Sequence, residues 1–125
     1  MNVEQVRAFC LSLPETYEKV SGEPANIHVF KIRDKQFAYF KTSEPEKWRF
    51  SLRVSPERFL ELTDQEGVKP ARYMHRYHWI SVVEVDKFDE NYLRELIQWS
   101  YHKVIASLSK KDQLQIKSAI EYDSQ

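Results

Sequence analysis

The chain has 125 residues, and its 19 Lys and Arg balance 19 Asp and Glu, which argues against a polybasic nucleic-acid clamp. Its two glycines, Gly22 and Gly67, are too far apart for a phosphate-binding glycine loop. Its single cysteine excludes a disulfide framework and a multi-cysteine zinc site.

The first third of the chain predicts one helix followed by strands. Asn2 and Gln5 have the spacing of a capping box, and apolar residues follow at helical intervals as far as Pro14. Asp34-Lys35 then separates two β-rich segments, which predicts a hairpin loop at this dipeptide. The predicted strands are 17–20, 26–33 and 36–41.

The rest of the chain alternates between helix and strand. Residues 48–54 strictly alternate apolar and polar side chains, which is the pattern of a half-buried strand. The other predicted elements are a helix at 56–65 capped by Ser55, a loop at 67–72, a strand at 77–83, and two helices that begin near Asp89 and Ser109. This order predicts one α+β domain, 1–125, of two layers, with an antiparallel sheet and helices packed on one face.

The predicted hairpin register sorts the strand side chains into two faces, because cross-strand partners point to the same side. The first face is apolar and is expected to form the core: Phe30, Ile32, Phe37, Tyr39, Trp48, Phe50, Leu52 and Val54. The second face is expected to hold Val29, Lys31, Arg33, Gln36, Ala38, Phe40, Arg49, Ser51 and Arg53, joined by Tyr77, Trp79 and Ser81 from the last strand. A slip of one residue would exchange the faces of the first two strands.

The second face contains Lys, Arg and aromatic residues but no carboxylate. Such a surface suits nucleic acid, because cations neutralise phosphates and rings stack on unpaired bases. Solvated sheet faces also carry Lys and Arg for general reasons, since their stems cover apolar surface and edge lysines prevent aggregation. Both interpretations stay open at this point.

The segment 69–79 is the densest local cluster of cations, histidines and aromatic residues, and it contains no acid. Loops on a rigid scaffold often carry function, so this segment is a candidate binding element. The alternative is a crossover loop whose aromatic residues complete the core.

No catalytic or metal-binding constellation is apparent in the sequence. Cys10 lies on the apolar stripe of the first helix, which predicts a buried thiol rather than a nucleophile. His75 and His78 lack a neighbouring Cys or carboxylate pair to complete a zinc site, and Arg76 between them repels a cation. We therefore predict a protein that is not an enzyme and needs no metal and no cofactor.

Taken in order, the motifs of this chain resemble those of the MmcQ/YjbR family of small bacterial proteins. The residues that carry the resemblance are Leu13-Pro14-Glu15, Phe30-x-Ile32, Lys35-x-Phe37-Ala38, Leu52 with Ser55-Pro56-Glu57, Pro70-Ala71-Arg72-Tyr73-Met74, His78-Trp79-Ile80-Ser81-Val82, and Ser100-Tyr101 with Val104, Leu108 and Lys110-Lys111. The resemblance implies a CyaY-like α+β fold and DNA binding through a double-wing arrangement of β-hairpins. The chain departs from the family at Asp34-Lys35, where a turn glycine is usual, and at His75-Arg76, where Asn-Lys is frequent.

We expect a cytoplasmic monomer that binds nucleic acid, in the form of double-stranded DNA, with little base specificity. No membrane contact is expected, because the start of the chain lacks the pattern of a signal peptide and no apolar run approaches the roughly 20 residues of a membrane span. The expected phosphate contacts are Lys31, Arg33, Arg49 and Arg53, extended by Arg72 and Arg76, with Trp79 and Tyr77 against sugars or bases. The alternatives are a protein-interaction or small-anion-binding domain that uses the same face, and an enzyme whose site is assembled from scattered residues.

Overall fold

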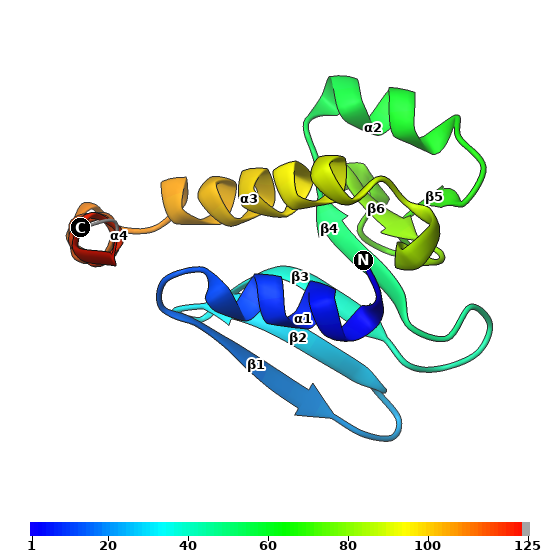
Figure 1. The fold of residues 1–125 in the computed structure, drawn as a ribbon, viewed down its shortest axis with the longest axis horizontal. Helices are drawn as coiled ribbons and strands as arrows, with labels where there is room; N and C mark the ends of the chain where they lie inside the picture. Colours follow the sequence, from blue (N-terminus) through cyan, green and yellow to red (C-terminus); the bar gives the residue numbers. More distant parts are fainter. Residues whose placement is uncertain (124–125) are drawn as a thin grey trace.

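The computed structural model describes residues 1–123, which form a six-stranded sheet and four α-helices (Figure 1). In chain order the elements are α1 (Val3–Ser12), β1 (Thr16–Ser21), β2 (Ile27–Ile32), β3 (Lys35–Lys41), β4 (Arg49–Arg53), α2 (Pro56–Thr63), β5 (Val68–Pro70), β6 (Trp79–Val82), α3 (Glu90–Ala106) and α4 (Lys110–Asp123). Within the described chain, no helix combines the length and the hydrophobicity that crossing a membrane requires.

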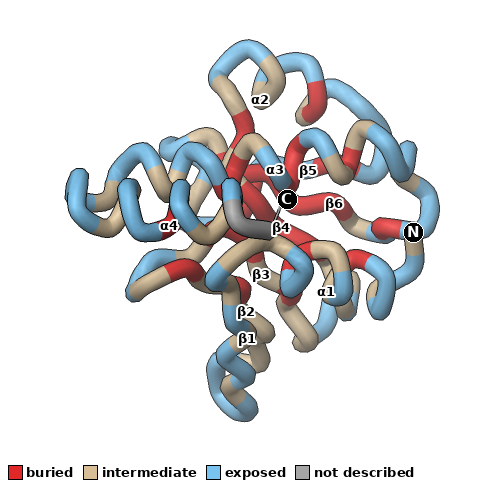
Figure 2. The backbone as a smooth tube through the Cα atoms, turned by 60° about the vertical axis from the view of Figure 1, so that its left-hand side comes forward, coloured by how far each residue is buried: buried red, intermediate tan, exposed pale blue. Residues whose placement is uncertain are grey.

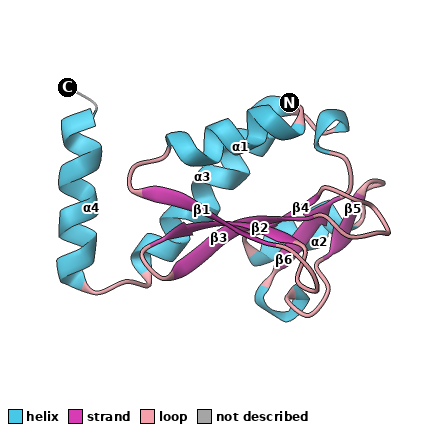
Figure 3. Ribbon diagram, turned by 90° about the horizontal axis from the view of Figure 1, so that it is seen from below, coloured by secondary structure: helices cyan, strands magenta, loops and turns pink. Residues whose placement is uncertain are grey.

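The strand order is β1-β2-β3-β4-β6-β5, and every neighbouring pair is antiparallel. Helices α1 and α3 lie on the same side of this sheet (Figure 3). Helix α2 packs at the β5–β6 edge, where Arg58 Nη2 donates to Glu95 Oε1 of α3 at 2.7 Å. Helix α4 lies beyond the end of α3 (Figure 1). The predicted two-layer α+β fold is confirmed.

The helices begin where the sequence predicts. The Asn2 side chain accepts from the amide of Gln5 at 2.8 Å, while the Asn2 amide donates to the Gln5 side chain at 2.9 Å, so the capping box is complete. Ser55 and Asp89 cap α2 and α3 through the amides of Arg58 and Tyr92. Two leucines of these helices are exposed, Leu60 in α2 and Leu114 in α4.

The β2–β3 hairpin differs from the predicted register by one residue. Its loop is Arg33-Asp34 rather than Asp34-Lys35, so Ile32 lies opposite Lys35. Arg33 takes φ 55° at the first loop position, a left-handed conformation that non-glycine residues seldom adopt. The register shifts again at Phe37, which is an extra residue in β3 between the pairs Phe30–Ala38 and Lys31–Gln36.

This difference reverses the predicted faces of three residues in β3. Ala38 and Phe40, which were predicted on the second face, are fully buried in the core. Tyr39, predicted in the core, lies on the opposite face. The physical reason is that side chains alternate along a strand, so a one-residue slip moves each of them to the other side.

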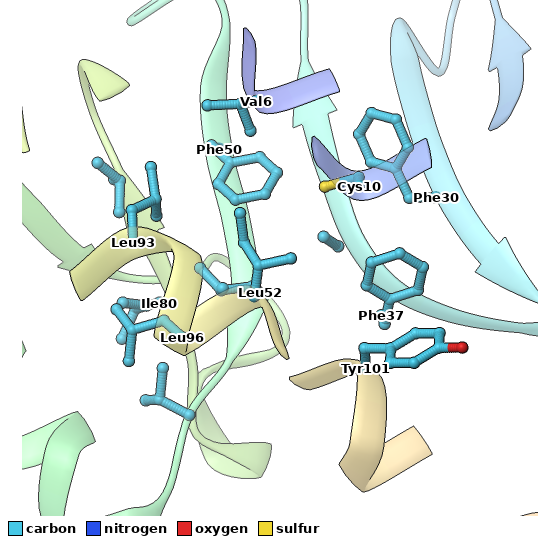
Figure 4. Close-up of a cluster of buried hydrophobic side chains, with 14 of the residues drawn as sticks. Val6, Cys10, Phe30, Phe37, Phe50, Leu52, Ile80, Leu93, Leu96 and Tyr101 are labelled. Carbon is cyan, nitrogen blue, oxygen red and sulfur yellow. The ribbon is translucent and has the colours of Figure 1, made fainter. Parts of the chain in front are cut away.

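The core lies between the sheet and the helices α1 and α3 (Figures 2 and 4). Cys10 is fully buried, which confirms the prediction of a buried thiol. Burial raises the pKa of this thiol, and the nearby Glu18 charge raises it further. Ser100 of α3 donates its hydroxyl to the carbonyl of Phe37 at 2.6 Å. Since a bulge leaves a backbone group without its ladder partner, this hydrogen bond holds the bulge against α3.

The C-terminal half of the sheet contains two further differences from the sequence analysis. Strand β5 lies within the predicted loop 67–72, where Val68 pairs with Val82. The last strand begins at Trp79 rather than Tyr77, because residues His75–Tyr77 form a single turn of 3₁₀ helix. His78 joins this turn to β6 with φ 66°.

Candidate functional site

The face of the sheet away from α1 and α3 carries the side chains that alternate with the core residues. We call it the open sheet face. By the observed register it holds Tyr17, Lys19, Ser21, Ile27, Val29, Lys31, Gln36, Tyr39, Lys41, Arg49, Ser51, Arg53, Lys69, Trp79 and Ser81. This set includes Lys and Arg but no Asp or Glu, so the predicted absence of acids from this face of the strands is confirmed.

A cavity of about 660 Å³ lies where the open sheet face meets the β2–β3 turn and the end of α3, and we call it the basic cavity. Its cations come from β1, β2, the start of β3, β4 and the last turn of α3, and Asp34 is the one carboxylate among its lining residues. The lining consists of Lys19, Ser21, Val29, Lys31, Asp34, Lys35, Gln36, Arg53, Met74, Tyr77, Trp79, Lys103, Val104 and Ser107.

The cations of the basic cavity differ in their pairing from three arginines that lie near the helices. Arg7, Arg33 and Arg58 hold carboxylates of Glu18, Glu15 and Glu95 at 2.6, 3.2 and 2.7 Å. Among residues 1–123, by contrast, Lys19, Lys31, Lys35, Arg53 and Lys103 form no ion pair. These five cations of the basic cavity are therefore left without an ion-pair partner in the described part of the chain.

The aromatic wall of the basic cavity is formed by Trp79 and Tyr77. Trp79 lies opposite Arg53 in the strand register, and its ring stacks on Tyr39 with centroids 5.7 Å apart. Only 5 % of Trp79 is exposed, so the indole supports the cavity rather than offering a free face. Tyr77 is 49 % exposed and is the more accessible ring.

The segment 71–78 flanks the basic cavity and presents the predicted loop cations. It is anchored at its base, where the amide of Ala71 donates to the carbonyl of Trp79 at 2.9 Å. The guanidinium carbons of Arg72 and Arg76 each lie 5.2 Å from the ring centroid of the following tyrosine. Both arginines are exposed, so they extend the positive surface beyond the cavity.

Two of the predicted phosphate contacts are placed differently. Arg33 lies in the hairpin turn, where it pairs with Glu15 at 3.2 Å and with Asp112 of α4 at 3.6 Å, so its predicted place on the second face is wrong. The hydrogen bond to Glu15 raises the pKa of the Arg33 guanidinium. Arg49 is on the open sheet face, but its Nη1 donates to backbone carbonyls of the loop before β4, including that of Ser43 at 2.9 Å.

The structure thus brings together three of the predicted residues in the basic cavity and two beside it. Lys31, Arg53 and Trp79 line the cavity, and Arg72 and Arg76 flank it. Three further lining residues were not predicted for the site: Lys19, Lys35 and Lys103. Alternation along β1 offered a signal for Lys19, whereas nothing in the sequence indicates that the last turn of α3 reaches this face.

A second charged cluster lies on the core side of the sheet and is internally neutralised. Glu18 accepts from Arg7 and contacts His28 Nδ1 at 3.2 Å. These hydrogen bonds, that from Arg7 first, hold the pKa of Glu18 below its ordinary value. Within residues 1–123, no group of three or more His, Cys, Asp and Glu side chains is arranged to hold a metal ion.

Comparison with known proteins identifies related sequences. The sequence model of the YjbR family matches residues 11–103, which run from the end of α1 to the last turns of α3. The uncharacterized Escherichia coli O157:H7 protein YbdF is 36 % identical over 92 residues, which cover 71 % of this chain and 73 % of that protein. The uncharacterized Escherichia coli K12 protein YjbR is 25 % identical over 113 residues, covering 89 % of this chain and 93 % of its own.

Solved structures share the fold. The Deinococcus radiodurans protein DR2400, with a DUF419 domain, superposes with a TM-score of 0.79 at 25 % identity, covering 93 % of this chain and 88 % of its own. A Pseudomonas syringae protein superposes with a TM-score of 0.64 at 23 % identity, covering 80 % of this chain and 96 % of its own.

Proposed function

The chain belongs to the YjbR family, and we propose that it binds double-stranded DNA, without catalysis, through cations of the open sheet face and of segment 71–78. The observation that supports this proposal is the gathering of five cations, none of which forms an ion pair among residues 1–123, in one cavity. Arg7, Arg33 and Arg58 are neutralised by carboxylates, while the cations that line the basic cavity are not. A polyanion fits this surface because it supplies the missing counter-charge.

The proposed contacts to phosphates come from Lys31, Arg53, Arg72 and Arg76, which were predicted for this role, together with Lys19 of the cavity lining. Contacts to phosphates fix the position of a protein on DNA but carry no sequence information, so little base specificity is expected. The formal net charge of zero limits the attraction at long range. Affinity is therefore expected to be modest and to depend strongly on salt.

Fluorescence anisotropy of a labelled blunt duplex, titrated at several salt concentrations, tests the proposal. With about four to six phosphate contacts, the logarithm of the binding constant should fall with the logarithm of the salt concentration with a slope of about −4 to −5. Lys31→Glu and Arg53→Glu should each weaken binding and flatten this slope by about 1.

Lys87→Glu is the matched control, because it makes the same change of charge at an exposed lysine outside the basic cavity, paired with Glu84 at 3.3 Å. We expect this variant to bind duplex with nearly the wild-type affinity. An absence of duplex binding at low salt, or an equal loss of affinity in all three variants, contradicts the proposal.

A further inference from the structure

We infer that the basic cavity accepts one unpaired nucleotide of the bound DNA, with its base against Tyr77 and its phosphate among the lysines. This inference rests on the proposed function and specifies the form of DNA that the site prefers. Paired bases stay inside the double helix, so a duplex offers the cavity its phosphates but no base. A nucleotide at an overhang, a gap or a flipped position is free to enter it.

The size of the basic cavity supports a single nucleotide as its occupant. Its volume of about 660 Å³ falls within the range of roughly 300–1,000 Å³ that is usual for pockets that enclose one small molecule. A flat basic surface would suit phosphates alone. A hollow of this size, lined in part by Met74 and Tyr77, also offers apolar contact to a base.

Lysines and aromatic residues of the cavity lining lie at opposite sides of the sheet. Lys19 and Lys31 lie on β1 and β2 at one side, while Trp79 lies on β6 at the other and Tyr77 precedes it. Three strand steps separate β2 from β6, which corresponds to about 14 Å between backbones, and long side chains shorten this span. A nucleotide has the same polarity, with an anionic phosphate at one end and an aromatic base at the other.

Arg53 lies between the two ends of the cavity, on β4, opposite Trp79 in the strand register. Its guanidinium is a donor only, and it has no ion pair among residues 1–123. It can therefore donate to a phosphate or to acceptor atoms of a base. Asp34, the one acidic lining residue, lies at the β2–β3 turn.

Binding of three labelled DNAs of equal length and phosphate number tests the inference. The first is a blunt duplex, the second replaces its last pair by a single-nucleotide overhang on each strand, and the third carries an abasic residue at each overhang. Because stacking of one base contributes a factor of roughly ten to affinity, the intact overhang should bind about tenfold more tightly than both others.

Variants separate the base contact from the phosphate contacts. Tyr77→Ala should abolish the preference for the intact overhang while keeping the affinity for blunt duplex within about twofold, and Tyr77→Phe should retain the preference because stacking needs only the ring. Tyr17→Ala is the control, since Tyr17 is exposed to a similar degree on the same face but does not line the cavity.

Equal affinities for the three DNAs, with a strong salt dependence, overturn this inference and leave the proposed function standing. A preference that survives in Tyr77→Ala also overturns it, because the base would then lie elsewhere. No binding of any of the three DNAs at low salt overturns the proposed function and this inference together.

Discussion

The indole of Trp79 stacks on the phenol ring of Tyr39 across the intervening strand β4, with 5.7 Å between ring centroids and 27° between ring planes. The residue of β4 opposite Tyr39 is Ser51, whose small side chain is buried and hydrogen-bonded to Ser81 at 2.6 Å. This small pair lets two large rings meet above the middle of the sheet. The stack supports the wall of the basic cavity.

The stack predicts energetic coupling between Tyr39 and Trp79. In a double-mutant cycle with Tyr39→Leu and Trp79→Leu, urea unfolding should yield a coupling free energy of about 0.5–1.5 kcal/mol, the range of aromatic pairs beyond simple burial. A control cycle of Tyr17→Leu with Trp79→Leu should yield a coupling within about 0.5 kcal/mol of zero. If both cycles give the same value, the stack does not contribute as described.

The hydrogen bond from Ser100 to the Phe37 carbonyl predicts a second effect on stability. Ser100→Ala leaves this buried carbonyl without its partner, which should lower the free energy of unfolding by about 1–3 kcal/mol. Ser107→Ala, at the residue that caps the C-terminus of α3, is the matched control, because its hydroxyl donates to the Val104 carbonyl at 2.6 Å in an exposed position. The control should change stability by less than about 0.5 kcal/mol. Equal costs for the two variants would contradict the role assigned to Ser100.

The interaction of Glu18 with Arg7 predicts a dependence of stability on pH. The pKa of Glu18 is lowered from its ordinary value of 4.5, chiefly by the hydrogen bond from Arg7. The ionised carboxylate therefore stabilises the fold above that value, and this contribution is lost as the pH falls through the folded-state pKa.

Urea unfolding of wild type and Glu18→Gln between neutral and acid pH measures this contribution. The variant should be less stable at neutral pH, and the difference should shrink as the pH falls below 4.5. Glu4→Gln removes an exposed partner of the same guanidinium, 2.8 Å away, and should cost at most about 1 kcal/mol. A difference for Glu18→Gln that stays constant with pH would refute the assignment.

Lys31 and Arg33 are two positions apart in the chain but have different partners, and this predicts different effects on DNA binding. Lys31 lines the basic cavity, whereas Arg33 pairs with Glu15 and Asp112. Lys31→Gln should weaken duplex binding and flatten the salt slope by about 1. Arg33→Gln should leave both unchanged and accelerate amide hydrogen exchange in α4, which loses an anchor. Equal weakening of DNA binding by the two variants would place Arg33 in the interface.

Much of the fold follows from local patterns that the sequence displays directly. Asn2, Ser55 and Asp89 cap the helices as predicted, and the alternation of residues 48–54 identifies the core face of β4. The hairpin register was the principal error. The sequence predicts Asp34-Lys35 as the loop, but the loop begins at Arg33, which adopts the left-handed conformation although it is not a glycine. The bulge at Phe37 depends on packing against α3, which local sequence does not indicate.

The basic and aromatic character of the site was predicted better than the list of residues that form it. Alternation placed Lys31, Arg53 and Trp79 on one surface, and they do line one cavity. Arg33 was misplaced because it belongs to the hairpin loop rather than to β2. Lys103 was missed because helix periodicity does not reveal where a helix ends relative to a sheet. The ion pairs that distinguish Arg33 from the cations of the basic cavity form only in the folded chain.

The central claim is that DNA binds the open sheet face, and the most direct measurement is the change of amide chemical shifts on titration of ¹⁵N-labelled protein with duplex. The account predicts the largest changes on β1, β2, β4 and segment 71–78, centred on Lys19, Lys31 and Arg53, and a loss of these changes at high salt. Changes confined to the exposed surfaces of α1 and α3, with none at Lys31 and Arg53, would contradict it.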